Sequence, residues 1–200
     1  MKKTLLLILV VAGSATASYA QIGFGVKAGY SIATIHADEG SNPITWSSQP
    51  AFHAGVLVSI PVVLGLSIQP EVLYSGQGGK FNSDGDPGNL KTALINVPIM
   101  IKYSIHGAFL ETGPQFGFLA SAKITTDGQT TDEKSNFQST QLAWGVGLGY
   151  KLPLGLGIDA RYNFALSKMA KSGSDFDAAA SDAKNGVFQV GLFFVIGGKK

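Results

Sequence analysis

The segment from Ala93 to Leu119 constrains the fold most, because apolar and polar residues alternate through two arms joined by a tight connection. In the first arm the apolar side consists of Ile95, Val97, Ile99, Ile101 and Tyr103. In the second arm it consists of Ala108, Leu110, Thr112, Pro114, Phe116 and Phe118. Residues two apart in a strand share a face, so the pattern predicts a β-hairpin with Lys102 and Glu111 on its other face. Such a hairpin is typical of a membrane barrel, although half-buried strands of soluble sheets also alternate.

The first 20 residues have the features of a cleaved secretory signal peptide. They contain Lys2 and Lys3, an apolar run from Leu5 to Ala12, and a small-residue site at Ser18-Tyr19-Ala20. We therefore expect a single mature domain at residues 21–200. No later segment approaches the roughly 18 consecutive apolar residues of a transmembrane helix. The chain has 0 cysteines, which excludes a cysteine-linked lipid anchor, disulfides and thiolate metal sites.

The charge balance argues against a nucleic-acid-binding protein. Removing the predicted leader takes away two of 15 basic residues, and the remaining 13 match the 13 acidic residues. Nucleic-acid binding would require a clustered basic excess. Charged residues make up 14% of the chain, against about 25% in typical soluble domains, and 26 residues are glycine. Both deviations favour a barrel in lipid.

Eight segments show the same alternation and predict eight strands. They are residues 22–34, 50–62, 66–75, 93–103, 108–119, 138–151, 156–164 and 185–197. Long polar connections at residues 36–49, 76–90, 121–136 and 167–184 alternate with three short ones. This order predicts an all-β protein: an eight-stranded antiparallel up-and-down transmembrane β-barrel with four long extracellular loops and three short periplasmic turns. Its aromatic girdles would comprise Tyr30, Tyr74, Tyr103, Trp144, Tyr150 and Tyr162.

The inner face of this predicted barrel carries one balanced set of charges. The set consists of Lys27, Glu71, Lys102, Glu111, Asp159 and Arg161. Side chains fill the interior of an eight-stranded barrel, and buried charges require partners. We therefore expect a structural ion-pair network in the lumen. The alternative is a path for protons or small ions.

Two other groups of residues suggest chemistry, but both patterns are incomplete. His36 and His53 lie towards the predicted extracellular end, near Ser31, Asp38 and Glu39, where a rim hydrolase would place its site. No nucleophile elbow is present, so ordinary rim histidines are favoured and no catalytic residue is assigned.

The second group is the run Asn82, Asp84 and Asp86, which begins like a calcium-binding loop. Pro87 then replaces the required glycine and Ala93 the required glutamate, so we expect an exposed turn. No metal or cofactor site is assigned.

Several motifs together resemble one family. They are GVKAGYSIATI (Gly25–Ile35), NVPIMIKY (Asn96–Tyr103), GPQFGFL (Gly113–Leu119), GVGLGY (Gly145–Tyr150) and the closing strand. In this order the chain resembles the outer-membrane β-barrel family of Bacteroidota that includes PorT-like and "porin family" proteins. The resemblance covers essentially the whole mature chain and implies an eight-stranded barrel in the cell outer membrane. It carries over no catalytic motif.

The closing segment Gln189–Ile196, QVGLFFVI, resembles the signal that the barrel assembly machinery reads. Many such signals end on an aromatic residue, whereas this chain continues through Gly197 to Lys200. The resemblance implies the assembly machinery as a partner during insertion.

The expected function is that of a small non-enzymatic barrel with a structural or interaction role. Its partners would be outer-membrane lipid and an extracellular or envelope protein that contacts the four loops, including a secretion assembly. One alternative is a lipid or peptide hydrolase at the extracellular rim. Another is a soluble periplasmic barrel that binds a ligand, which would require large apolar residues on the inner face.

Overall fold

The computed structural model describes residues 22–36, 45–83, 86–126, 129–132, 134, 138–167 and 184–197. The predicted signal peptide lies outside these ranges. The strands are β1 (Gly23–His36), β2 (Thr45–Val63), β3 (Leu66–Ser83), β4 (Asp86–Ile105), β5 (Ala108–Thr126), β6 (Gln129–Asp132), β7 (Thr140–Lys151), β8 (Leu156–Ala165) and β9 (Lys184–Gly197). No helix among the described residues is long and apolar enough to cross a membrane.

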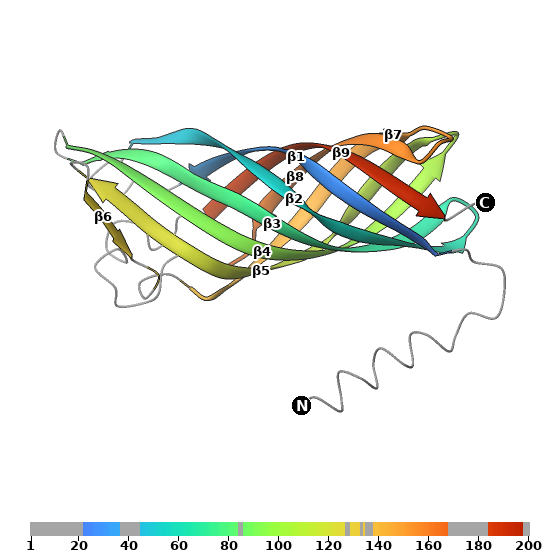
Figure 1. Ribbon diagram of the computed structural model, residues 1–200, viewed down its shortest axis with the longest axis horizontal. Helices are drawn as coiled ribbons and strands as arrows, with labels where there is room; N and C mark the ends of the chain where they lie inside the picture. The colour runs from blue at the N-terminus through green and yellow to red at the C-terminus, as the bar shows by residue number, and fades with distance from the viewer. Residues whose placement is uncertain are drawn as a thin grey trace, which may run out of the picture.

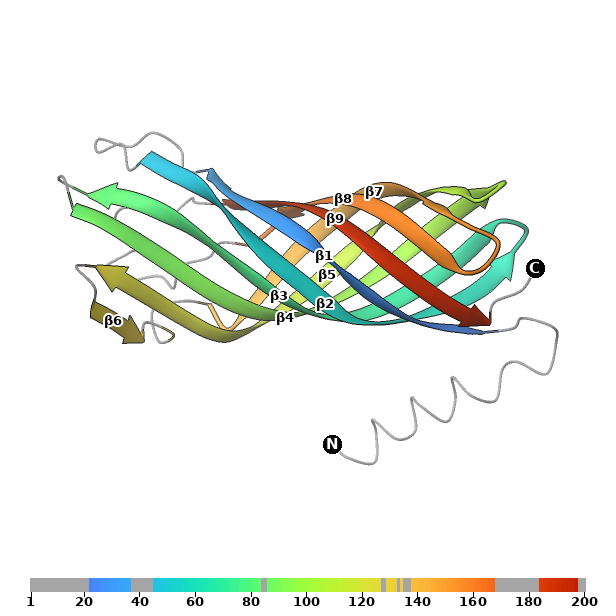
Figure 2. The same ribbon diagram turned by 45° about the horizontal axis from the view of Figure 1, so that its top comes forward.

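The eight long strands of the described chain form a closed barrel. Each pairs antiparallel with the next long strand, and β1 also pairs with β9 from Gly23↔Gly197 to His36↔Lys184. Figures 1 and 2 show the strands tilted around a single long barrel, with β6 beside the outer end of β5. Closure removes the free sheet edges, whose unpaired backbone groups would each cost several kcal/mol in lipid. The predicted fold class is confirmed.

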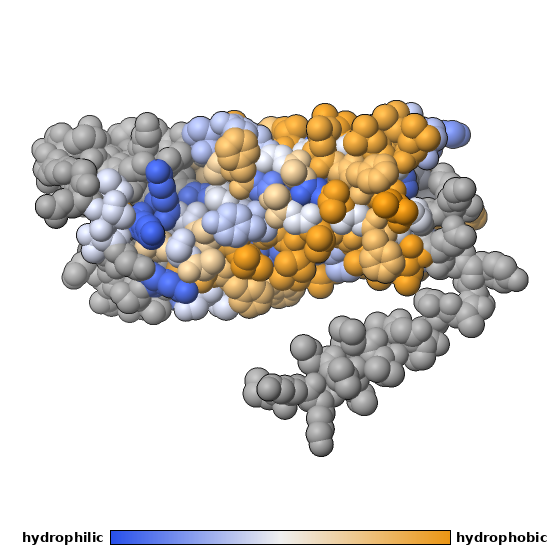
Figure 3. Space-filling view, viewed as in Figure 1, coloured by the Kyte–Doolittle hydropathy of each residue, from blue (hydrophilic) through white to orange (hydrophobic). Residues whose placement is uncertain are grey.

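Apolar side chains cover the outside of the barrel. Phe24, Val56, Leu148 and Leu192 each expose more than half of their surface. Figure 3 shows a broad hydrophobic zone over the half of the barrel that bears the short turns, with hydrophilic residues towards the opposite end. All six predicted girdle residues are exposed; they are Tyr30, Tyr74, Tyr103, Trp144, Tyr150 and Tyr162. This surface suits hydrocarbon.

One polar group on this apolar face is satisfied locally. The indole Nε1–H of Trp144 on β7 donates a hydrogen bond to Thr112 Oγ1 on β5 at 2.9 Å. The Thr112 hydroxyl in turn donates to the carbonyl oxygen of Gly145 at 3.1 Å. Thr112, on the outer face, thus provides a hydrogen-bond acceptor for the indole N–H, which would be costly to leave unpaired in lipid.

Short turns close one end of the barrel. Two-residue connections at Leu64–Gly65 and His106–Gly107 join β2 to β3 and β4 to β5. His106 has φ +50° and Gly107 has φ +91°, the pair of positive angles that a type I′ hairpin turn requires. Such tight turns lie on the periplasmic side of outer-membrane barrels.

The strands at the opposite end are longer than predicted. β3 and β4 remain paired up to Ser83↔Asp86, so the predicted loop 76–90 is wrong and this segment is mostly a β-hairpin. β2 begins inside the predicted loop 36–49, and β5 pairs with β6 inside the predicted loop 121–136. Above the lipid the outer face of a strand contacts water instead of hydrocarbon, so the apolar alternation that signals a strand disappears. The predicted loop 167–184 lies almost entirely outside the described residues.

We predict that Val56→Arg destabilises the folded barrel by about 2 to 4 kcal/mol in lipid vesicles, because the charge would enter the hydrocarbon. Val56 faces outward between Val26 and Val72 of the neighbouring strands. Urea titration of the refolded protein measures the change. Leu64→Arg, in an exposed turn, is the matched control and should change stability little. Equal losses in the two variants would contradict the assignment of the lipid face.

Candidate functional site

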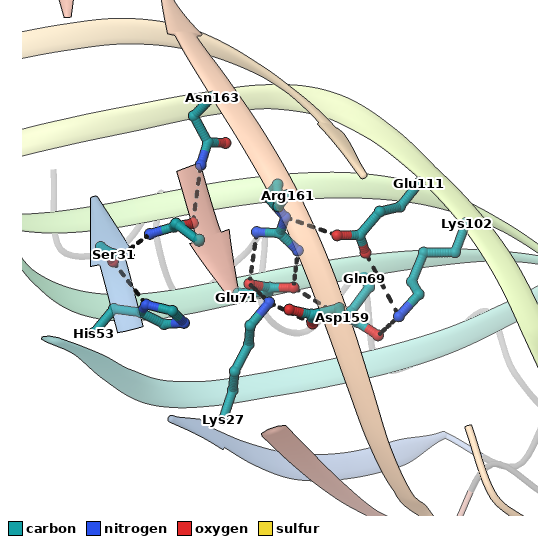
Figure 4. A network of polar contacts seen from close by, with 11 residues as sticks. Lys27, Ser31, His53, Gln69, Glu71, Lys102, Glu111, Asp159, Arg161 and Asn163 are labelled. Carbon is teal, nitrogen blue, oxygen red and sulfur yellow. Dashed lines mark hydrogen bonds and ion pairs between the residues drawn. The ribbon is translucent and has the colours of Figure 1, made fainter. Parts of the chain in front are cut away.

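The six predicted lumenal charges lie together inside the barrel. Lys27 comes from β1, Glu71 from β3, Lys102 from β4, Glu111 from β5, and Asp159 and Arg161 from β8. Each is at most 5% exposed. Figure 4 shows their side chains converging from the wall of the barrel. Inward alternation on five different strands is what brings these residues to one place.

Arg161 is the centre of this group of six charged side chains, which we call the charged belt. Its Nη1 and Nη2 donate to Glu71 Oε2 and Oε1 at 3.0 and 2.8 Å. Its Nε donates to Glu111 Oε1 at 2.7 Å. One planar guanidinium therefore holds two carboxylates on different strands, with the two-pronged geometry that makes arginine–carboxylate contacts strong. The interaction joins β3, β5 and β8 across the lumen.

Two lysines complete the balance of charge. Lys27 Nζ lies 2.6 Å from Asp159 Oδ2 and 4.0 Å from Glu71 Oε2. Lys102 Nζ lies 3.6 Å from Glu111 Oε2. Each acidic side chain thus has at least one cationic partner, as burial of a charge requires.

Lys102 also has neutral partners. It donates to Gln69 Oε1 at 3.2 Å, and Gln69 Nε2 donates to Glu71 Oε1 at 2.7 Å. Its ammonium group lies 3.6 Å from the ring centroid of Phe109 and 4.9 Å from that of Phe193. The faces of the two rings favour a nearby cation. Lys102 therefore marks the border between the charged belt and an apolar layer.

A chain of neutral polar groups continues from the belt. Asn163 Nδ2 donates to Gln189 Oε1 at 2.9 Å, and Gln189 Nε2 donates to Ser31 Oγ at 3.4 Å. Ser31 Oγ and His53 Nδ1 share a hydrogen bond of 2.8 Å. Figure 4 shows this chain beside the charged belt.

Apolar side chains fill the lumen on both sides of these polar layers. The cluster towards the short turns comprises Leu57, Phe109, Phe193 and Val195. The cluster towards the long hairpins comprises Leu94, Leu119 and Ala122, with Ile124 packed against it. The described lumen is thus a stack of apolar, charged, neutral-polar and apolar layers.

Glycines in the wall make room for this filling. A Cβ at Gly147 would lie 2.9 Å from Glu111 Oε1 and 2.8 Å from the backbone oxygen of Ala160. A Cβ at Gly149 would overlap the ring of Phe109, and one at Gly157 the ring of Phe193. The motif GVGLGY therefore reflects bulky side chains reaching across from other strands.

The histidines do not form the alternative catalytic site. His53 is 1% exposed inside the lumen and lies eight residues from the outer end of β2 at Thr45, so its placement near the extracellular rim is wrong. His53 pairs with Gly29, and His36 lies seven residues further along β1, about 23 Å away at strand spacing. Ser31 is equally buried, and Asp38 and Glu39 lie outside the described residues. The Ser31–His53 hydrogen bond therefore lies away from any surface that a lipid or peptide could approach.

The incomplete calcium motif belongs to a hairpin. Asn82 pairs with Pro87 and Ser83 with Asp86 in the ladder of β3 and β4. Asp84 lies outside the described residues. Among the described residues, no group of three or more histidines and carboxylates is arranged to hold a metal ion.

Comparison with known proteins identifies the family. A family model described as an outer membrane protein beta-barrel domain matches residues 14–171. The chain belongs to this outer-membrane barrel family. The protein is thus located in the outer membrane, and the alternative of a soluble periplasmic barrel is wrong. No curated protein matches the chain.

Solved structures share the fold at low sequence identity. Neisserial surface protein A has a TM-score of 0.56 and 15% identity, over 86% of this chain and 96% of that chain. Ail, the attachment invasion locus protein of Yersinia pestis, solved with the heparin analogue sucrose octasulfate, has a TM-score of 0.50 and 15% identity. That match covers 88% of this chain and 99% of Ail.

Alternation alone did not single out the neutral members of the lumenal network. Gln69, Asn163 and Gln189 carry no charge. Their amide groups were the only feature that distinguished them from the other residues predicted to face inward. The contacts of Phe109 and Phe193 with Lys102 join strands that are far apart in sequence. Such contacts depend on the barrel's register and closure, which the sequence pattern does not specify.

We predict that Arg161→Met lowers the free energy of unfolding by about 3 to 5 kcal/mol, because Glu71 and Glu111 would remain buried without their shared cation. Urea titration in vesicles measures the change. Lys151→Met, which removes a half-exposed charge at the barrel end, should change stability by about 0.5 kcal/mol or less. A loss below about 1 kcal/mol for Arg161→Met would contradict a central role for this guanidinium.

Proposed function

We propose that this protein is a non-conducting outer-membrane barrel that supports the envelope and presents its extracellular hairpins as an interaction surface. The filled lumen is the observation that carries the proposal. Layers of apolar, charged and amide side chains occupy the interior, and eight strands enclose little more than the volume such side chains need. The ion-pair network then has a structural role and is not a path for ions.

The outer strand ends supply a surface for interaction. From Tyr74↔Ile95 to Ser83↔Asp86, β3 and β4 continue for about 30 Å of paired strand beyond the aromatic level. Figures 1 and 2 show β2 to β5 projecting furthest at the end away from the short turns. A paired hairpin loses less conformational freedom on binding than a loose loop does, which favours recognition. Ail shows that this fold is compatible with a bound polyanion in another protein.

The proposal assigns no catalytic residue. We also propose that the chain is one of the PorT-like and "porin family" barrels of Bacteroidota, because it contains the motifs described above. Within that group the hairpins would contact an extracellular or envelope protein, including a component of a secretion assembly. The segment Gln189–Ile196 forms most of β9, where the barrel assembly machinery would engage it before β9 pairs with β1.

We predict no steady ionic conductance from the refolded protein in planar bilayers, because apolar, charged and amide side chains fill the described part of the lumen. A sixteen-stranded porin in the same bilayer serves as the positive control. Stable conductance steps that scale with protein concentration would contradict the proposal and favour an ion path through the charged belt.

We predict that Asp86→Cys is labelled by a membrane-impermeant maleimide on intact cells, because the β3–β4 hairpin lies outside the cell. The chain contains no other cysteine, so the label reports a single site. Leu64→Cys, in an exposed short turn, is the matched control and should react only after permeabilisation. The reverse pattern would overturn the proposed orientation.

A further inference from the structure

Two lysines lie side by side on the outer face of the barrel. Lys91 of β4 and Lys123 of β5 are register partners, and both are exposed. Side chains directly opposite each other on one face of an antiparallel pair are close neighbours, and like charges in this position destabilise the pair. On its other side, Lys123 pairs in register with Asp132 of β6.

A β-bulge creates this arrangement. Ala93 pairs with Ser121 and Leu94 with Leu119, so Ala120 is an extra residue on β5. Phe116 and Phe118 face outward, and strict alternation would turn Lys123 into the lumen. The extra residue reverses the alternation and directs Lys123 outward, opposite Lys91. Bulges commonly re-aim side chains in this way.

The backbone of the pair lies just beyond the lipid headgroups, within reach of its lysine side chains. Moving down the outer face, the next partners are Ala93 and Ser121, and then Ile95 and Phe118, which begin the large apolar surface. Lys91 is four residues above Ile95, about 13 Å along the strand and about 9 Å along the membrane normal at a tilt of about 45°. The headgroup layer extends about 5 to 7 Å beyond the hydrocarbon in each leaflet. Long lysine side chains span the remaining difference.

We propose that Lys91 and Lys123 together bind a phosphate-bearing headgroup in the outer leaflet. A phosphate group between the two ammonium groups would attract both of them and so offset their mutual repulsion. Lysines near a membrane surface also favour anionic lipid. Figure 3 shows hydrophilic side chains towards this end of the barrel, beyond the hydrophobic zone. The site rests on the outer-membrane location and goes beyond the proposed role of the hairpins, because its ligand is the membrane itself.

The test compares the protein in phosphatidylcholine vesicles with and without diphosphorylated lipid A. Thermal loss of the compact electrophoretic form measures stability. The wild type should gain stability as lipid A is added. In Lys91→Gln/Lys123→Gln this gain should require about 10- to 30-fold more lipid A, since each lysine near the surface contributes about 1 kcal/mol. Without lipid A, the double variant should be at least as stable as the wild type, because the repulsion is gone.

Two controls separate the sources of the effect. Lys151→Gln removes one positive charge at the periplasmic end and should keep the full gain. Dephosphorylated lipid A should give the wild type no gain. The proposal is overturned if the double variant responds to lipid A as the wild type does, or if the dephosphorylated lipid works equally well. It is also overturned if inorganic pyrophosphate in plain vesicles reproduces the lysine-dependent gain, which would identify a soluble anion as the ligand.

Discussion

The requirement that every backbone N–H and C=O in lipid be paired determines the rest of this structure. Eight strands meet it only because β1 and β9, the first and last strands, pair along their whole length. Closure at eight strands leaves a narrow lumen. That lumen must then be filled, and the filling decides what the barrel can do.

The polar filling is organised around Arg161. A cation with three directed donor groups holds Glu71 and Glu111 in fixed positions, while Lys27 and Lys102 balance the remaining negative charge. The side chains are bulky, so the register partner on the adjacent strand is glycine where they lie against it, as at Gly147 beside Glu111. Apolar layers on both sides separate the charges from water. The interactions that we propose therefore involve the outer surfaces: the hairpins at the extracellular end and the Lys91–Lys123 pair near the headgroups.

Strand number, facing direction and membership of the lumenal charge set follow from the sequence, because lipid outside imposes strict alternation. Contacts that depend on three-dimensional closure do not follow from it: Arg161 meets Glu71 although 90 residues separate them. The extension of β3 to Ser83 was missed because no lipid marks its outer face there. The bulge at Ala120 was not predicted, because one extra residue reverses the alternation of apolar and polar positions. In the sequence this reversal looks the same as the start of a polar loop. His53 was misplaced because its strand begins five residues earlier than predicted, at Thr45.

Refolding from urea with and without amphiphile tests the central claim most directly. If lipid outside and a filled lumen inside hold the barrel together, β-type circular dichroism and a heat-modifiable electrophoretic shift should appear only when micelles or vesicles are present. Without amphiphile the exposed apolar face should aggregate or stay unfolded. Cooperative folding to a soluble monomer in plain buffer would contradict the account, because the apolar outward face would then be stable in water without lipid or detergent.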